Sequence, residues 1–287
     1  MAILIDGKQL AKELNEQTKQ AVLALQQEGV TPGLAVVIVG EDPASQIYVR
    51  SKRKKAEQLG IHSIVRELPA TISEAELIGV VEQFNADPSI HGILVQSPLP
   101  KHIAEPKVVR AILPTKDVDG FHPLNVGKLY ANTNLDYPVA CTPKGIMTML
   151  EKYHIEVAGK EAVVVGRSNI VGRPMAALLN NADATVTLTH RFTQNLSDFT
   201  RRADILVVAT GVTHLIKKTD VKPGATVIDV GMDRDAEGKL TGDVDFDQVQ
   251  EVAGAITPVP GGVGPMTIAT LMQQTVELAK WSDSRGK

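Results

Sequence analysis

Residues 161–179, EAVVVGRSNIVGRPMAALL, predict a buried strand, a glycine-containing turn and the start of a helix. The apolar run before Gly166 is rich in valine, which favours a strand, and Pro174 suits the first turn of a helix. Unpaired N–H groups at such a helix start can hold a pyrophosphate, because the positive end of the helix dipole lies there as well. The stretch departs from the GxGxxG fingerprint, since Ser168 replaces the second glycine and Gly172 is displaced. The pattern alone therefore leaves a dinucleotide site and an ordinary strand–helix turn both open.

Five further short runs of apolar and β-branched residues predict strands buried on both faces. They are residues 34–39, 92–96, 185–189, 205–209 and 226–230. Helix-like segments lie between them: apolar positions between Leu10 and Leu25 fall on one helix face, and Ser73 with Glu76 forms a capping box. This alternation predicts an α/β fold with parallel sheets and crossover helices.

Two segments rich in proline and glycine interrupt the alternation. Residues 114–143 hold four prolines, and residues 254–265, GAITPVPGGVGP, hold seven Gly or Pro. Because such residues disfavour packed elements, we interpret the two segments as crossings between domains. The sequence thus predicts an α/β catalytic domain over 1–143, completed by 256–287 with a returning C-terminal helix, and an inserted Rossmann-like dinucleotide domain over 144–255. A length of 287 residues suits two domains.

The composition argues against several classes of protein. With 30 Lys plus Arg against 33 Asp plus Glu and only 3% aromatic residues, the chain lacks the features of a nucleic-acid binder. No apolar run approaches the length of about 18 residues that marks a membrane span, and charges interrupt residues 1–14 where a signal peptide is apolar. Cys141 is the single cysteine, which is typical of the cytoplasm. The seven histidines show no metal-ligand spacing, so we expect no metal site.

The strand predicted at 185–189 ends at His190 and Arg191. An NAD site usually offers Asp or Glu at this point to the ribose 2′-hydroxyl. A carboxylate would repel a 2′-phosphate, whereas Arg191 could form charge-assisted hydrogen bonds with it. The sequence therefore favours NADP over NAD. A solvated loop cation is the alternative interpretation of Arg191.

Tyr48 and Lys52 are four residues apart on a helix that EDPAS, residues 41–45, is expected to start. A phenol and an amine would then line one helix face. Further cations on this helix could lower the pKa of a partly buried Lys52 or attract a polyanionic substrate tail. They are Arg50, Arg53, Lys54 and Lys55. A solvated helix face is the alternative interpretation.

Two polar residues and one loop are further candidates for a ligand site. Gln96 ends an apolar run, at the strand end where α/β proteins bind ligands. Asp119 lies in the turn KDVDGFHP, although Asp before Gly is also ordinary turn chemistry. The loop TPVPGGVGPMT, residues 257–267, lets a flat ligand approach the backbone, and an interdomain hinge fits it equally well.

Nine segments together occur in an order that is typical of one family. They are YVRSKRKKA, ILVQSPLP, KDVDGFHP, CTPKGI, VVVGRSNIVGRPMA, TLTHRFT, ILVVATG, VIDVG and ITPVPGGVGPMT. Over about residues 1–280 the chain closely resembles the bifunctional methylenetetrahydrofolate dehydrogenase/methenyltetrahydrofolate cyclohydrolase (FolD) family. The resemblance implies oxidation of 5,10-methylenetetrahydrofolate by NADP, then hydrolysis to 10-formyltetrahydrofolate, in one cleft between the domains. It also implies a place in one-carbon metabolism and purine biosynthesis, substrates that could be polyglutamylated, and a homodimer formed through the nucleotide-binding domain.

The resemblance also implies roles for individual residues. Lys52 would be the catalytic residue of hydrolysis, and Gln96 would hydrogen-bond to it. Tyr48 would stack on or orient the folate, and Asp119 would anchor the pterin. The residues expected to contact the cofactor are Gly166, Arg167, Ser168, Arg191 and Met232. The loop residues expected to contact the substrate are Pro260, Gly261 and Gly262.

Two other classes of function stay open at this stage. One is a different two-domain NADP oxidoreductase, similar to shikimate dehydrogenase, against which the 257–267 loop and the Tyr48–Lys52 pair argue. The other is a folate-binding or NADP-binding protein without catalytic activity, against which an intact Lys52 argues.

Overall fold

The structure, a computed structural model, describes residues 2–234 and 237–286 and divides into two compact units. Unit 1 comprises Met1–Lys12 and Thr142–Thr267, and unit 2 comprises Glu13–Cys141 and Ile268–Lys287. The chain passes from one unit to the other within helix α1 (Gly7–Gln27), at the start of α6 (Cys141–Lys152) and within α10 (Val263–Gly286). Each unit therefore contains segments from both halves of the sequence.

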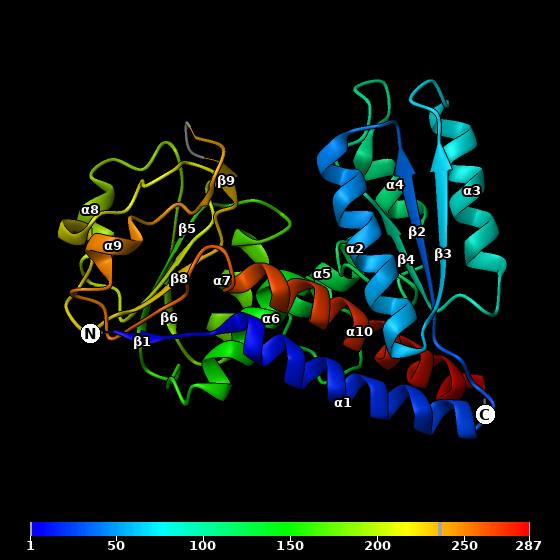
Figure 1. The fold of residues 1–287 in the computed structure, drawn as a ribbon, viewed down its shortest axis with the longest axis horizontal. Coiled ribbons are helices and arrows are strands. Elements are labelled where there is room, and N and C mark those ends of the chain that lie inside the picture. The colour runs from blue at the N-terminus through cyan, green and yellow to red at the C-terminus, as the bar shows by residue number, and fades with distance from the viewer. Residues whose placement is uncertain (1, 235–236, 287) are drawn as a thin grey trace. The chain divides into compact units, whose positions relative to one another are not determined.

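Unit 2 is built on a three-stranded parallel sheet in the order β3-β2-β4. Besides its parts of α1 and α10, its elements are β2 (Gly33–Val39), α2 (Pro43–Leu59), β3 (His62–Leu68), α3 (Glu74–Ala86), β4 (Gly92–Val95), α4 (Glu105–Ala111) and α5 (Pro123–Tyr130). All residues of β2 are buried, because helices cover both faces of the sheet (Figure 1). Leu34, Val36 and Ile38 pack with residues of α1, α2 and α10, whereas Ala35 and Val37 pack with residues of α3 and α4. A continuous apolar run is what such a strand requires.

Unit 1 contains a six-stranded parallel sheet in the order β1-β11-β8-β7-β5-β6. Its elements, besides parts of α1, α6 and α10, are β1 (Ile3–Leu4), β5 (Glu161–Val165), α7 (Gly172–Asn181), β6 (Thr185–Thr189), α8 (Leu196–Thr200), β7 (Ile205–Val208), a short 3-10 helix (Lys218–Asp220), β8 (Thr226–Asp229), the pair β9 (Asp233–Arg234) and β10 (Leu240–Thr241), α9 (Phe246–Val249) and β11 (Ala255–Ile256). The chain leaves β5 to form β6 on one side and returns to form β7 on the other. Such a change of direction opens a crevice at the carboxyl ends of β5 and β7.

The six strands predicted from apolar runs are confirmed, with ends that differ by at most one residue from those expected. The capping box is also confirmed, since Ser73 Oγ accepts from Glu76 N and a Glu76 carboxyl oxygen accepts from Ser73 N. The expectation that every strand is buried on both faces is wrong for β6, which is partly exposed because it lies at the edge of its sheet.

Residues 114–143, where we expected no packed element, contain helix α5. Pro123 occupies the first helical turn, where its missing N–H costs nothing, and the preceding His122 caps the helix by accepting from Leu124 N. Asn125 and Leu129 are buried. Proline therefore starts a helix in this segment. Among the described residues, no helix is both long and apolar enough to cross a membrane.

Candidate active site

Lys52 and Gln96 meet in unit 2. Lys52 is partly buried on α2, whose start is fixed by Pro43 in the first turn and by Asp42, which accepts from Ser45 N. The Nζ of Lys52 donates to Gln96 Oε1 over 3.0 Å. Gln96 follows β4, and its Nε2 donates to the carbonyl oxygen of Ser97, which keeps the amide oxygen available to the lysine. The expected contact between Lys52 and Gln96 is present in the structure.

Lys52 and Asp119 each influence the pKa of the other. Burial lowers the pKa of Lys52, while the charges of Asp119 and Cys141 oppose this shift. Burial also raises the pKa of Asp119 to about 6; the charge of Lys52 counters this effect and that of Asp117 adds to it. An amine and a carboxyl whose pKa values both move towards neutrality suit proton transfer.

Asp117 fixes the turn that carries Asp119. It is 1% exposed, and its carboxyl group accepts hydrogen bonds from the backbone N–H of Phe121 at 3.2 Å and of His122 at 2.8 Å. Asn125 Nδ2 donates to it as well, over 2.9 Å. Burial raises the pKa of Asp117 despite these donors. The turn is therefore organised by a carboxyl group that the sequence reasoning did not single out.

The other side of this turn is held by α10. Gln274 is fully buried, and its Nε2 donates to the carbonyl oxygens of Val118, at 2.6 Å, and Val139, at 2.8 Å. Cys141 Sγ also contacts the Val118 oxygen, at 3.4 Å. Gly120 has a φ of +70°, and a Cβ there would lie 2.4 Å from the Val139 carbonyl carbon. Asp119 is thus presented by a turn with little freedom, and a residue more than 150 positions away contributes to this.

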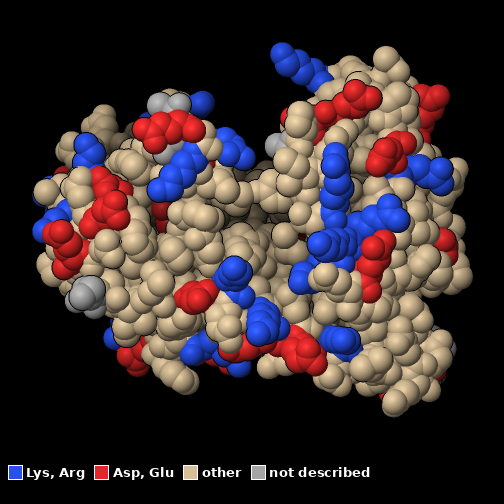
Figure 2. All heavy atoms as spheres, viewed as in Figure 1, with Lys and Arg blue, Asp and Glu red and all other residues tan. Residues whose placement is uncertain are grey.

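Tyr48 lies one helical turn before Lys52 on α2 and is partly buried. Figure 2 shows Lys and Arg side chains gathered over α2. Two of them pair along the helix: Arg53 Nε lies 2.8 Å from a Glu57 carboxyl oxygen, and Arg50 donates to Gln46 Oε1 over 3.0 Å. These contacts favour the solvated-face interpretation for Arg50 and Arg53, whereas Lys52 turns inward to Gln96.

A pocket of about 730 Å³ lies in unit 1 at the carboxyl ends of β5, β6 and β7. Its lining includes Gly166, Arg167, Ser168, His190, Arg191 and Thr210. Gly166 has a φ of +112°, and a Cβ there would lie 2.1 Å from the Ala209 oxygen. A Cβ at Gly172 would lie 1.9 Å from the Gly166 oxygen. Both glycines therefore serve the close packing that a dinucleotide turn requires.

Arg191 is exposed, and its guanidinium carbon lies 4.7 Å from the centre of the Phe192 ring. The described residues that line the pocket include no Asp or Glu. A 2′-phosphate would thus meet cations and no carboxylate. The donor set fits NADP, because the backbone N–H groups that follow Gly166 suit a pyrophosphate and Arg191 suits the additional phosphate. The first amides of α7 are already used, since Val171 N and Gly172 N donate to Ser168 Oγ and Arg173 N donates to the Ser168 carbonyl oxygen.

Four further candidates lie in unit 1 outside this pocket lining. Met232 follows β8, is 48% exposed, and has its sulfur 3.4 Å from where a Cβ on Gly264 would lie. Pro260, Gly261 and Gly262 form the loop before α10, and the Gly261 oxygen accepts from Lys8 N over 2.9 Å. The structure therefore gathers Met232 with the glycine-rich stretch that precedes and opens α10.

Family models match both parts of the chain. The catalytic-domain model for "Tetrahydrofolate dehydrogenase/cyclohydrolase" matches residues 5–119, and the model of the corresponding NAD(P)-binding domain matches residues 140–283. The chain belongs to this family.

Relatives within the tetrahydrofolate dehydrogenase/cyclohydrolase family are similar along their whole length. The chain is 68% identical to the "Bifunctional protein FolD" of Levilactobacillus brevis over 100% of this chain and 99% of the relative. The crystal structure of the bifunctional enzyme FolD from Campylobacter jejuni matches with a TM-score of 0.96 and 48% identity, covering 98% of this chain and 99% of that one. The FolD structure from Trypanosoma brucei, complexed with NADP cofactor and inhibitor, matches with a TM-score of 0.94 and 40% identity over 98% of both chains.

Membership in the family also decides between the classes of function that the sequence left open. The chain is a bifunctional folate enzyme with dehydrogenase and cyclohydrolase activities. It is neither a shikimate dehydrogenase-like enzyme nor a binding protein without activity.

Proposed function

We propose that Lys52 and Asp119 in unit 2, and the pocket at the carboxyl ends of β5 and β7 in unit 1, carry the two activities of this chain. The chain oxidises 5,10-methylenetetrahydrofolate with NADP and hydrolyses the 5,10-methenyl product to 10-formyltetrahydrofolate. The observation that carries the assignment is the hydrogen bond from Lys52 to Gln96 beside the shifted carboxyl of Asp119.

Hydrolysis requires proton transfers that Lys52 can perform. Water adds to the methenyl carbon and loses one proton; the bond from this carbon to N5 then breaks, N5 gains a proton, and the second proton of the water leaves to solvent. Burial lowers the pKa of Lys52, which favours an amine that accepts the first proton and returns it to N5. Gln96 holds the amine in place through its amide oxygen.

Substrate binding is assigned to Asp119 and Tyr48. The carboxyl of Asp119 can accept hydrogen bonds from the amino and ring N–H groups of a pterin, and the phenol ring of Tyr48 can stack on the folate. The loop Pro260–Gly262 allows close approach of a flat ligand. Lys54, which is exposed on α2, supports a substrate with a polyglutamate tail.

NADP, when bound in the unit 1 pocket, accepts the hydride of the dehydrogenase step. The residues of this chain bind and orient it: Gly166 and Ser168 supply backbone at the turn, and Arg191 faces the 2′-phosphate. The NADP named for the Trypanosoma brucei relative supports this choice of cofactor. Met232, after β8, is assigned to the cofactor as well.

The functional domains that we infer are residues 1–143 with 256–287 for folate and residues 144–255 for NADP. They differ from the compact units at residues 1–12, 142–143 and 256–267, which cluster with unit 1. We further propose a homodimer formed by unit 1, supported by the edge position of β6, since an edge strand can pair with a second copy. Sedimentation velocity of the whole chain measures whether it is a monomer or a dimer.

One assay tests the function directly. The protein is incubated with 5,10-methylenetetrahydrofolate and NADP, and NADPH and methenyltetrahydrofolate absorbance are followed together. We expect NADPH to form while methenyltetrahydrofolate stays low, because hydrolysis consumes it. Absence of NADPH would refute the dehydrogenase assignment, and methenyltetrahydrofolate that accumulates in step with NADPH would refute the cyclohydrolase assignment.

A further inference from the structure

Three carboxyl groups meet in unit 1 that the two reactions do not use. They belong to Asp229, Asp233 and Asp243, of which Asp229 is 2% exposed and Asp243 is fully buried. Among residues 2–234 and 237–286, no group of His, Cys, Asp and Glu is arranged to hold a metal ion. A buried carboxyl group is costly unless it is hydrogen-bonded, so the partners of these groups indicate what they do.

Asp243 accepts hydrogen bonds from three consecutive backbone N–H groups. Its Oδ2 lies 2.5 Å from Thr210 N and 3.3 Å from Gly211 N, and its Oδ1 lies 3.0 Å from Val212 N. These amides belong to the loop that follows β7, and Thr210 and Val212 line the 730 Å³ pocket. The carboxyl of Asp243 thus determines where this wall of the pocket lies.

Asp229 in turn fixes the backbone of Asp243. Its Oδ1 accepts from Asp243 N over 3.0 Å, and its Oδ2 accepts from Val244 N over 3.0 Å. Gly242 makes this approach possible, because a Cβ there would lie 1.9 Å from Asp229 Oδ2. Asp229 ends β8, so the position of Asp243 is tied to the central sheet.

Asp233 completes the surroundings of Asp243. Its pKa is raised, first by burial and then by a hydrogen bond to the carboxyl of Asp243 and by the charge of that group. The Asp243 carboxyl group therefore accepts from the three amides of Thr210–Val212 and lies beside the carboxyl group of Asp233.

We propose that Asp243 is a positioning residue of the NADP site. Its carboxylate holds the backbone of Thr210–Val212 in the shape that the bound dinucleotide requires, without touching the reacting atoms. The proposal rests on the assignment of the unit 1 pocket to NADP. It implies that Asp243 serves the dehydrogenase activity and not hydrolysis, which uses no dinucleotide.

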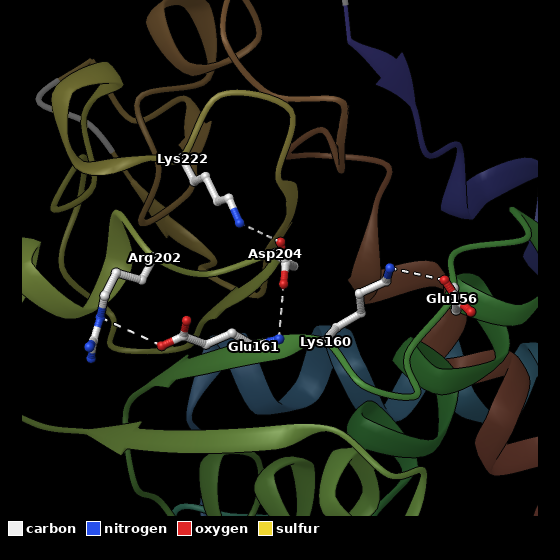
Figure 3. Close-up of polar contacts among 6 residues, drawn as sticks. All are labelled: Glu156, Lys160, Glu161, Arg202, Asp204 and Lys222. Atoms are coloured by element: carbon white, nitrogen blue, oxygen red, sulfur yellow. Dashed lines mark hydrogen bonds and ion pairs between the residues drawn. The ribbon is translucent and has the colours of Figure 1, made fainter.

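Asp243→Asn tests this, because the amide places a donor where backbone N–H groups already point. We expect the KM for NADP to rise about tenfold, while hydrolysis of added methenyltetrahydrofolate changes by less than about twofold. Asp204→Asn is the matched control. Asp204 accepts a hydrogen bond from Glu161 N and pairs with Lys222 (Figure 3). It lies at the amino ends of β5 and β7, whereas the pocket lies at their carboxyl ends. It should leave the KM for NADP unchanged.

If Asp243→Asn does not fold, a second pair of variants tests the positioning role. Gly211 has a φ of +70° and Gly224 has a φ of +84°, so replacement by alanine strains the backbone at both positions equally. Neither replacement alters a buried carboxyl group. Gly211→Ala should raise the KM for NADP, and Gly224→Ala, just before β8, should not.

The possible outcomes separate this inference from the NADP assignment. The positioning role would be overturned if each control variant raised the KM for NADP as much as its test variant does. It would also be overturned if Asp243→Asn lost oxidation and hydrolysis to the same extent. A wild-type enzyme whose oxidation rate does not depend on NADP would refute the NADP assignment itself.

Discussion

Lys52 combines an inward-facing amine with a lowered pKa, and hydrolysis depends on both. Lys52→Met keeps the length and the apolar stem of the side chain and removes the amine. We expect hydrolysis of methenyltetrahydrofolate to fall by about 10² or more, and NADP-linked oxidation to fall much less, so that methenyltetrahydrofolate is released. A proportional loss of both activities would assign Lys52 to substrate orientation, and persistence of hydrolysis would assign proton transfer to another residue.

Asp119 is a carboxyl whose charge burial disfavours, as its pKa of about 6 shows. Asp119→Asn should therefore cost the fold little, while the pterin loses an acceptor of its N–H groups. We expect weaker folate binding and lower rates of both activities, with a nearly unchanged Tm. Folate affinity measured beside thermal unfolding checks this, and an early melt without loss of affinity would identify Asp119 as a turn residue.

Arg191 sets the preference between the two dinucleotides. A charge-assisted contact with the 2′-phosphate contributes about 1.5 to 3 kcal/mol. Arg191→Ala should thus raise the KM for NADP about tenfold or more and leave the use of NAD nearly unchanged. Steady-state kinetics with both cofactors measures the ratio, and an equal loss with both would assign Arg191 to the fold or to the pyrophosphate.

Asp229 makes the stability of unit 1 depend on pH. Burial raises its pKa to about 7, whereas the unfolded chain titrates this group near its usual value of about 3.9. Between these values the folded state binds more protons, so the contribution of Asp229 is present at low pH and is lost as pH rises through about 7. Urea unfolding between about pH 4 and pH 7 should show a weaker pH dependence for Asp229→Asn than for wild type. Identical slopes would contradict the assignment.

At the scale of elements, α10 supports the turn that carries Asp119. Gln274→Leu removes the donor of one buried and one partly buried carbonyl group, which costs about 1 to 3 kcal/mol, and should raise the KM for the folate substrate. Thr275→Val is the matched control, because Thr275 is equally buried on the same helix but donates to the Leu271 carbonyl oxygen within that helix. If both substitutions changed the KM for the folate substrate equally, α10 would affect substrate binding only through the stability of the fold.

The elements also show what the sequence could and could not predict. β2 was predictable because helices cover both its faces and its run is wholly apolar. β3 was missed because it is partly exposed and carries His62, Arg66 and Glu67. Among the site residues, Lys52 could be placed by its helical spacing and Gln96 by its strand end. Gln274 and Asp243 act on backbone groups far away in the sequence, and only the folded chain brings such partners together.

At the scale of the whole molecule, NADP should stabilise the fold by mass action. A ligand at about 100 times its Kd adds about 2.7 kcal/mol to the free energy of unfolding when it binds the folded state only. We expect NADP to raise the Tm of wild type more than that of Arg191→Ala at the same concentration. Hydrogen exchange should locate the added protection at the turn after Gly166 and the loop Thr210–Val212. Protection confined to unit 2 would contradict the NADP assignment.

The pairing of β1 with β11 has a consequence for biosynthesis. Ile3 lies beside Ala255 in the sheet, so β1 cannot pair until the ribosome has made β11. Unit 2 cannot be completed earlier than Gln274 either, because this residue binds the backbone beside Asp119. A nascent chain that stops short of these residues can complete neither unit and exposes apolar surface that chaperones recognise. Enzyme activity should therefore emerge only after Gln274 has been translated.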